Sequence, residues 1–334
     1  MLLITGGAGY IGSHCAALVL EQKKEIVIFD NLTTGHIETI ETLKKLGRVH
    51  FVHGDLRNKK EIESVFEKYN IEAVLHFAAS ALIGESMKNP EKYYQNNVAG
   101  TLNLLSTMLK HNVKKIIFSS TAATYGEPDY IPFDESHPQK PINPYGQSKL
   151  MIEKIMDDYD RVYGLKSVRL RYFNAAGADS KCRLGEWHDE ETHIIPNILK
   201  SALDSDRVFE MYGNDYDTKD GTCIRDYVNV EDLAQAHLLA LEYLNNGGKT
   251  DFFNLGTRNG NSIKEIISLC EDIIGTKIRV KEMPRRGGDP AKLVADNKKA
   301  KEILNWEPKR SLKDSIISAY KWEHYLSKVR KSDN

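Results

Sequence analysis

A glycine-rich turn at the start of the chain places the strongest constraint on its fold. The run Thr5-Gly6-Gly7-Ala8-Gly9-Tyr10-Ile11-Gly12 separates the apolar stretch 2–4 from an apolar helical pattern over 11–21. Glycines let the backbone turn tightly and approach a pyrophosphate, while the start of a helix supplies N–H donors and positive potential. A glycine pattern alone is a weak signal, but here strand, glycines and helix follow in the required order. The order predicts a strand–turn–helix unit that can bind a dinucleotide.

Short apolar runs alternate with helical patterns through the first half of the chain. Strands are predicted at 2–4, 25–30, 49–53, 73–77, 115–119 and 167–172, and helices at 11–21, 60–69, 91–111 and 145–163. Parallel strands that are covered by helices on both faces read as nearly continuous apolar runs. We therefore expect an α/β fold with a doubly wound parallel, Rossmann-type sheet as an NAD-binding domain over 1–174.

The regular pattern weakens beyond residue 174. Polar, glycine-bearing stretches occupy 175–192 and 214–221, and helical patterns recur at 231–245, 262–274 and 312–326. The chain of 334 residues also exceeds the size at which one core keeps growing. We expect a smaller mixed α/β C-terminal substrate domain over 175–330, with part of 223–256 returning to the first domain.

Composition limits the partners and the setting of the chain. Its formal net charge of -1 gives no case for nucleic acid or an anionic membrane surface as a partner. The four cysteines are far apart and form no CxxC pair, which argues against a metal site or disulfides and for a reducing compartment. No leader precedes the first strand, and no apolar stretch approaches the ~20 residues of a membrane span. We expect a cytoplasmic protein that binds no metal.

Asp30 closes the predicted second strand, where an acidic side chain can bind the hydroxyls of the adenosine ribose. Its carboxylate would repel a ribose phosphate, and the neighbouring Asn31 and Leu32 supply no arginine to compensate. The pattern favours NAD over NADP. A turn with a helix-capping aspartate is the structural alternative.

Two further segments follow predicted strands at the edge where such sheets bind ligands. Asp55, after the third strand, can hold the adenine edge or can simply cap the next helix. The small residues of Phe77-Ala78-Ala79, after the fourth strand, allow a cofactor to approach closely.

Tyr145 and Lys149 are four residues apart in a predicted helix that begins near Pro144. A nearby ammonium group favours phenolate and lowers the pKa of a tyrosine from ~10 toward working pH. Thr121 follows the fifth strand and can bind a substrate oxygen opposite Tyr145. The alternatives are a surface tyrosine beside a solvated lysine, and a threonine that satisfies its own backbone.

Longer strings make a family resemblance specific. Glycines 6, 9 and 12 occur with Asp30, Asp55, Thr121 and Tyr145-x-x-x-Lys149. The further strings are Gly84-Glu85-Ser86, Tyr93-Tyr94-Gln95-Asn96-Asn97, Arg171-Tyr172-Phe173-Asn174, Gly213-Asn214-Asp215-Tyr216, Gly221 to Val228 and Arg285 to Pro290. From residue 1 to about 310 the chain resembles the UDP-glucose 4-epimerase family of the extended short-chain dehydrogenase/reductases.

The resemblance implies reversible 4-epimerisation of UDP-glucose and UDP-galactose with bound NAD, and a homodimer. It makes Tyr145 the proton carrier for the sugar 4-hydroxyl, Lys149 its activator and Thr121 a ligand of the sugar oxygen. The cofactor-binding residues implied are Gly6, Gly9, Tyr10, Ile11, Gly12, Asp30, Asn31, Asp55, Leu56, Phe77, Ala78, Ala79, Asn96, Tyr145, Lys149 and Phe173. The substrate-binding residues implied are Thr121, Tyr145, Asn174, His193, Ile194, Met211, Tyr212, Arg225, Arg286, Asp289 and Leu293.

Among the departures from the pattern of many family members, two bear on how the substrate is bound. His193 stands where asparagine is frequent, so it either contacts phosphate differently or caps the following helix. Leu293 stands where some members have a tyrosine that crowds the sugar 2-substituent. The smaller leucine leads to the hypothesis that UDP-GlcNAc and UDP-GalNAc are also substrates.

Three other functions compete with epimerisation. A dehydratase needs an acid and a base beside Thr121, but Ala122 and Ala123 follow it and cannot transfer protons. A UDP-uronate decarboxylase, the closest alternative, needs a cation for the sugar carboxylate, and residues 80–83 contain none. A non-catalytic NAD sensor has no need of a proton carrier such as Tyr145.

A dimer interface is expected on two predicted helices, although a core position is the commoner reason for their apolar spacing. The residues concerned are Leu102, Leu105, Leu109, Ile152, Ile155 and Tyr159.

Overall fold

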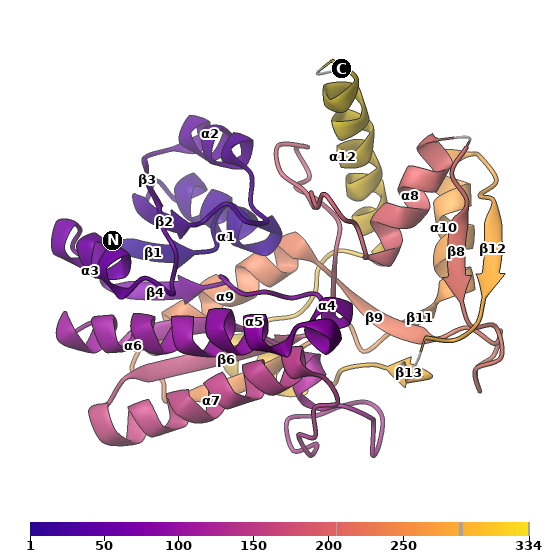
Figure 1. Cartoon of the computed structure of the whole chain (residues 1–334). Helices are drawn as coiled ribbons and strands as arrows, with labels where there is room; N and C mark the ends of the chain where they lie inside the picture. Colours follow the sequence, from indigo (N-terminus) through magenta and orange to yellow (C-terminus); the bar gives the residue numbers. More distant parts are fainter. Residues whose placement is uncertain (205, 287–289, 333–334) are drawn as a thin grey trace.

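Seven parallel strands form the central sheet of the computed structural model, which describes residues 1–204, 206–286 and 290–332. Their order across the sheet is β10-β6-β5-β4-β1-β2-β3, and each neighbouring pair is parallel (Figure 1). The strands are β1 (Leu2–Thr5), β2 (Ile26–Asp30), β3 (Val49–His53), β4 (Ala73–His76), β5 (Lys115–Thr121), β6 (Lys166–Tyr172) and β10 (Asp251–Leu255). The predicted doubly wound parallel sheet is confirmed, and its order reverses between β1 and β4, where such sheets bind ligands.

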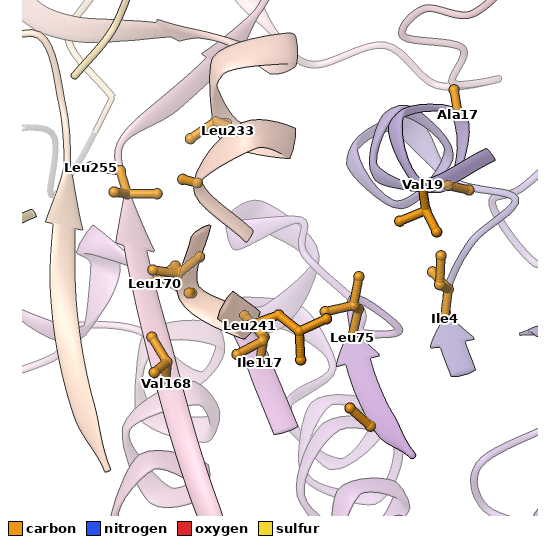
Figure 2. Close-up of a cluster of buried hydrophobic side chains, with 14 of the residues drawn as sticks. Ile4, Ala17, Val19, Leu75, Ile117, Val168, Leu170, Leu233, Leu241 and Leu255 are labelled. Atoms are coloured by element: carbon orange, nitrogen blue, oxygen red, sulfur yellow. The ribbon is translucent and has the colours of Figure 1, made fainter. Parts of the chain in front are cut away.

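Helices cover both faces of this sheet (Figure 1). One face carries α1 (Tyr10–Glu21), α2 (Ile37–Leu46) and α9 (Val230–Asn245), and the other α3 (Lys59–Lys68), α6 (Gly100–Lys110) and α7 (Pro144–Tyr163). Successive strand residues point to opposite faces, so Ile4 packs in one core and Leu3 in the other. Figure 2 shows the first core, where strand side chains lie beneath α1 and α9. Two buried faces explain why the strands read as continuous apolar runs.

The predicted helix over 91–111 is wrong in detail, because three elements share that stretch. A short helix α4 (Ile83–Lys88) is followed by α5 (Pro90–Tyr93), a π-helical segment η1 (Tyr94–Ala99) and then α6. A π-helical turn widens the helix, and such turns are frequent at functional sites. The helices α3 and α6 lie side by side beneath the sheet.

The second part of the chain forms two smaller sheets with their own core (Figure 1). One sheet contains β7 (Asn174–Ala176), β9 (Ile224–Asn229), β11 (Gly260–Ser262) and β13 (Lys292–Leu293), and the other pairs β8 (Phe209–Tyr212) with β12 (Val280–Met283). The helices here are α8 (Ile194–Leu203), α10 (Ile263–Ile274) and α12 (Leu312–Ser332). Among the described helices, none combines the length and apolarity that a bilayer crossing requires.

The chain returns to the large sheet after β9. Helix α9 packs against α1, β5 and β6, and β10 adds a seventh strand beside β6. A short helix α11 (Lys298–Leu304) then packs against β10 and α9. The chain therefore crosses between the two parts more than once, and α9, β10 and α11 from its second half complete the first part.

The apolar stripes of α6 and α7 face mainly inward. Leu105 and Ile152 are buried in the core beneath the sheet, and Leu109, Ile155 and Tyr159 pack partly against it. Leu102 alone of the six is largely accessible, with 37% of its surface exposed. Most of this spacing therefore reflects core packing.

Candidate active site

The glycines of the first turn are required by close backbone packing. Gly6 has φ of +73°, and a Cβ there would lie 2.5 Å from the amide nitrogen of Ala78. A Cβ on Gly12 would lie 2.2 Å from the Gly6 carbonyl oxygen. Gly9 is different, because its nearest neighbour would be that same oxygen at 3.5 Å, an ordinary contact. The described protein contacts at this position therefore do not by themselves require glycine.

The first turn of α1 is suited to an anion. Gly9 is the N-cap and offers no side-chain cap, and no acidic residue lies in the first turn. The first N–H groups of a helix have no partner within the helix, so those of Tyr10 and Ile11 can bind a phosphate group. The Tyr10 hydroxyl donates to the Gly177 carbonyl at 2.5 Å, which ties this turn to the segment after β7.

We expect Gly9→Ala to fold normally and to lose bound NAD. The added methyl meets no protein atom closer than 3.5 Å, but it occupies the approach to the pyrophosphate. The matched control Gly12→Ala should instead lower the unfolding midpoint, because its methyl collides with the Gly6 carbonyl. Cofactor content of the purified variants, with thermal unfolding, tests the pair. Full NAD occupancy in Gly9→Ala would contradict this assignment.

Asp30 is held against the glycine turn at the end of β2. Its Oδ2 accepts from the Ala8 amide at 2.9 Å and its Oδ1 from the Leu32 amide at 2.8 Å. Burial raises the pKa of Asp30, while both backbone N–H groups act in the opposite direction. Each carboxylate oxygen has a second lone pair that remains available to a ribose hydroxyl. The structure therefore places a suitable acceptor beside the turn.

Asp55 is engaged by a guanidinium that the sequence argument overlooked. Arg57 donates to Asp55 from Nε at 3.0 Å and from Nη2 at 2.7 Å, and Asn31 donates at 2.9 Å. The side-chain hydrogen bond from Arg57 holds the pKa of Asp55 well below its usual range. The capping alternative is wrong, because Asn58 is the residue that caps α3. Leu56 is buried beneath the same loop.

The segment after β4 is fixed from two sides. The amides of Phe77 and Ala78 donate to the Thr5 carbonyl at 2.9 and 3.1 Å. Ser80 then exchanges two hydrogen bonds with Asn97 of η1, which also donates to the Ser148 hydroxyl at 3.1 Å. Buried Asn97 thus joins this segment to α7. The neighbouring Asn96, predicted to bind the cofactor, donates weakly to the Ser80 hydroxyl at 3.3 Å. Ala79 directly precedes Ser80 in the sequence.

Helix α7 begins at Pro144, as predicted, and presents Tyr145 and Lys149. The Asn143 side chain caps its first turn by accepting from the Gly146 amide at 2.8 Å. The Lys149 ammonium donates to the Ser119 carbonyl at 2.8 Å and lies 6.0 Å from the centre of the Tyr145 ring. The cation and the phenol therefore share one side of the helix.

Burial dominates the titration of both groups. It raises the pKa of Tyr145, and a hydrogen bond with Thr121 acts in the opposite direction. Burial also lowers the pKa of Lys149 to about 7, against the attraction of Glu153. The expectation that Lys149 holds the pKa of Tyr145 down is wrong for this arrangement. A phenolate at Tyr145 therefore needs further positive charge when ligands are bound.

The lowered pKa of Lys149 predicts a pH dependence of stability. Between pH 7 and the ordinary value of 10.5, the unfolded lysine holds a proton that the folded one has released. Stability from this group therefore rises with pH across that window, by up to about 1.4 kcal/mol per pH unit. Lys149→Met should remove this slope in urea unfolding measured from pH 7 to 9.5. An unchanged slope would contradict the prediction.

Thr121 ends β5 and sits where α7 approaches most closely. Its hydroxyl accepts from the Ala123 amide at 3.1 Å at the start of the 3₁₀ turn η2 (Ala122–Thr124). A Cβ on Gly146 would lie 2.3 Å from the Ala123 carbonyl oxygen, so only glycine permits this contact. Gly146, which sequence reasoning did not identify, thus brings Tyr145 to Thr121. The hydrogen bond from the Ala123 amide is also the contact expected of a threonine that only satisfies its own backbone.

A buried ion pair supports α7 from below. Glu153 accepts from the Arg171 Nε at 3.0 Å and from its Nη2, and Ser120 donates to Glu153 at 2.5 Å. Both charged side chains are almost fully buried, at 3% and 2% exposure. The pair joins the helix that bears Tyr145 to the strand that precedes Asn174.

The register of β5 and β6 brings the predicted substrate-binding residue Asn174 close in sequence to the partner of Thr121. Thr121 lies opposite Tyr172 in the register of β5 and β6, so Phe173 and Asn174 follow directly. Asn174 donates to the Asp226 carbonyl at 3.0 Å. A cavity here is lined by Asn174, Gly177, His193 and Ile194, among others.

The predicted uridine residues lie farther along the second part. Arg286 stacks over the Tyr212 ring at 3.9 Å, whereas Met211 points into the core there. Arg225 donates to the Pro290 carbonyl at 2.8 Å, and its neighbour in register, Leu293, is half-buried. The predicted ribose ligand Asp289 lies outside the described residues.

His193 occupies the N-cap position of α8 but makes no side-chain cap, so the capping alternative is wrong. Its Nδ1 lies 2.6 Å from Glu186 and 3.1 Å from Glu191. Attraction to Glu186 raises the pKa of His193 well above its usual range. The sequence argument considered His193 alone and overlooked these carboxylates.

Comparisons with known proteins match nearly the whole chain. A family model described as GDP-mannose 4,6 dehydratase matches residues 3–318. The UDP-glucose 4-epimerase of Halalkalibacterium halodurans is 50% identical over 322 residues, which cover 96% of this chain and 95% of that protein.

Two solved structures are similarly close. UDP-glucose 4-epimerase from Brucella ovis, in complex with NAD, is 46% identical with a TM-score of 0.91, covering 96% of this chain and 98% of that one. The UDP-Glc/GlcNAc 4-epimerase from Campylobacter jejuni is 42% identical with a TM-score of 0.85, covering 97% of this chain and 99% of that one.

Proposed function

This chain belongs to the UDP-glucose 4-epimerase family, and we propose that Tyr145, Lys149 and Thr121 carry out its NAD-dependent epimerisation at carbon 4 of the sugar. The enzyme interconverts UDP-glucose and UDP-galactose. Bound NAD supplies the hydride acceptor, and afterwards the hydride donor, for that carbon. The observation that carries the assignment is the hydrogen bond of Tyr145 with Thr121 at the end of β5, in the sheet whose first strand leads into the glycine turn, with only alanines at 122 and 123.

The three residues have different roles. Tyr145 takes the proton of the 4-hydroxyl and returns it, and Thr121 holds the same oxygen by a hydrogen bond. Lys149, fixed through the Ser119 carbonyl, supplies positive charge next to the phenol and a donor for the nicotinamide ribose. Because its pKa is about 7, the charge of Lys149 responds to small changes in its surroundings. Ligands that bring negative charge close to it favour the ammonium form.

The second part of the chain binds the uridine diphosphate. We assign the diphosphate to Asn174, Arg225 and Arg286, and the uracil to the strand end at Met211 and Tyr212. The stacking of Arg286 on Tyr212 orients its planar guanidinium, which can present parallel donors to a phosphate. For Met211 the assignment rests on its backbone, because its side chain is buried in the core. His193, Ile194 and Asp289 complete the proposed set.

One assay tests the function. UDP-galactose is incubated with the purified chain, without added NAD, and UDP-glucose is followed by NMR. Product formation with no net redox change is expected. The absence of product from a preparation that contains NAD would refute the proposal. Loss of water from UDP-galactose would favour a dehydratase, and release of carbon dioxide from a UDP-uronate in a parallel assay would favour a decarboxylase.

Leu293 predicts tolerance of a bulky 2-substituent on the sugar. It is half-buried on β13, and the relative from Campylobacter jejuni is named for both UDP-Glc and GlcNAc. We expect turnover of UDP-GalNAc within about 200-fold of that of UDP-galactose, since one added group in a pocket changes binding by roughly 1–3 kcal/mol. Leu293→Tyr should suppress the N-acetyl activity and keep the other. Equal loss of both activities would contradict a role in selectivity.

The assembly, setting and domain division are also proposals. We propose a cytoplasmic homodimer, in which α6 and α7 contribute the exposed Leu102 and Met151 to the interface. All four cysteines are free thiols, which suits a reducing compartment. We retain 1–174 as the NAD-binding domain, joined by α9 and β10, and the remainder as the UDP-sugar domain. Sedimentation of the purified chain tests the dimer.

A further inference from the structure

Four side chains between β7 and α8 converge in a cluster, and only His193 among them belongs to the substrate-binding set proposed above. They are Glu186, His188, Glu191 and His193, and their potential ligand atoms all lie within 4.8 Å of one another. We propose that this cluster binds one divalent metal ion of the zinc class, as a structural site. Two imidazoles and two carboxylates supply four ligand atoms of types that zinc accepts, enough to fill a tetrahedral site with no open position.

The distances between the ligand atoms are close to those around tetrahedral zinc. With bonds of ~2.0–2.1 Å to nitrogen and oxygen, neighbouring ligand atoms around zinc lie about 3.4 Å apart. Here His188 Nδ1 lies 3.4 Å from Glu186 Oε1 and 3.6 Å from Glu191 Oε2. His193 Nδ1 lies 2.6 Å from Glu186 Oε1 and 3.1 Å from Glu191 Oε1. Binding of the ion would therefore require His193 to move away from Glu186.

Two of these atoms are buried within ion-pair distance of charged groups but make no hydrogen bond among the described residues. His188 Nδ1 and Glu191 Oε2 have no hydrogen-bond partner in the part of the chain that the structure describes. Buried polar atoms are nearly always satisfied, so such a pair calls for an explanation. An ion bound between them would satisfy both.

The charges around the cluster also favour a divalent cation. Lys200 lies 3.7 Å from Glu191 and 3.9 Å from Glu323, which is also buried. With neutral imidazoles, the carboxylates of Glu186 and Glu191 give the four ligands two negative charges. One divalent ion neutralises them. Protonation of both histidines is the competing explanation, and it predicts no metal binding.

The position of the cluster indicates what the ion would stabilise. Trp187 stacks on His36 with ring centres 3.9 Å apart, and Trp322 of α12 donates to the Glu186 carbonyl at 2.9 Å. The segment therefore contacts the first domain on one side and the second on the other. Glu186 and His193 also line the cavity beside Asn174. An ion here would hold the segment in place between the two domains.

Cobalt is a suitable probe, because four-coordinate Co²⁺ absorbs visible light far more strongly than six-coordinate Co²⁺. The full chain is purified, treated with a chelator, dialysed and titrated with Co²⁺ and then with Zn²⁺. We expect one equivalent of Co²⁺ with intense visible absorption, which Zn²⁺ displaces, and a higher unfolding temperature with Zn²⁺. Weak absorption, or less than a fifth of an equivalent bound, would overturn the proposal.

Matched variants locate the site. His188→Gln and Glu191→Gln should each weaken Co²⁺ binding by at least a hundredfold and abolish the stabilisation by Zn²⁺. The controls His50→Gln and Glu25→Gln remove members of another contacting histidine–glutamate pair, on the far edge of the sheet, and should bind Co²⁺ normally. Equal binding by the two sets of variants would exclude this cluster. The wild-type titration decides the proposal even if a variant fails to fold.

Discussion

Tyr145→Phe should lower kcat for conversion of UDP-galactose by roughly 10²–10⁴-fold, the usual contribution of a general acid–base group. The substitution removes only the hydroxyl, and the two residues directly after Thr121 are alanines, which cannot transfer protons. The ring keeps its edge contact with buried Tyr93, at 6.4 Å between centres, so folding should be little affected. Initial rates by NMR, with NAD content and thermal unfolding of the same preparation, measure these effects.

Tyr163→Phe is the matched control. Tyr163 lies at the far end of the same helix with 51% of its surface exposed. The activity of the Tyr163→Phe variant should therefore equal that of the wild type. If Tyr145→Phe retained activity within tenfold of this control, proton transfer would belong to another group.

Glu153→Gln should lower the free energy of unfolding by about 3–5 kcal/mol, the cost of breaking a buried ion pair from one side. The substitution keeps the shape of the side chain but leaves the Arg171 guanidinium without a counter-charge in the core. It also removes the charge that supports the ammonium of Lys149, so the pKa of Lys149 should fall further. Urea unfolding at pH 8 measures the stability loss.

The exposed pair Glu41 and Lys44 is the comparison for this ion pair. Its atoms lie 2.7 Å apart, but both side chains are about half exposed. Glu41→Gln should change the free energy of unfolding by at most about 0.5 kcal/mol. Similar losses in the two variants would mean that burial of the Glu153 pair has no energetic consequence.

The sheet was predictable because its pattern is local. A strand buried on both faces, such as β2, must be apolar along nearly its whole length. Close backbone packing at the end of β1 requires glycine at positions 6 and 12. The π-helical segment η1 was not predictable, since its widened turn depends on the contacts of Asn97 with Ser80 and Ser148. Those partners are distant in sequence.

The candidate site was predictable where motif and geometry coincide. The helix start at Pro144 and the meeting of Tyr145 with Thr121 follow from adjacent signals. The direction of the pKa shift of Tyr145 did not, because it depends on how deeply the folded chain buries the phenol. The cluster around His193 was overlooked because metal ligands were sought only among cysteines. Histidines and glutamates at 186, 188, 191 and 193 were the available signal.

The late position of β10 in the chain affects how the enzyme is made. The central sheet stays incomplete until residue 255 has left the ribosome, because β10 then pairs with β6. Until α9 and β10 arrive, one edge of β6 has free N–H and C=O groups, and Val168 and Leu170 lack their cover. Such an edge pairs readily with other chains. The nascent enzyme therefore passes through an aggregation-prone stage that the finished fold conceals.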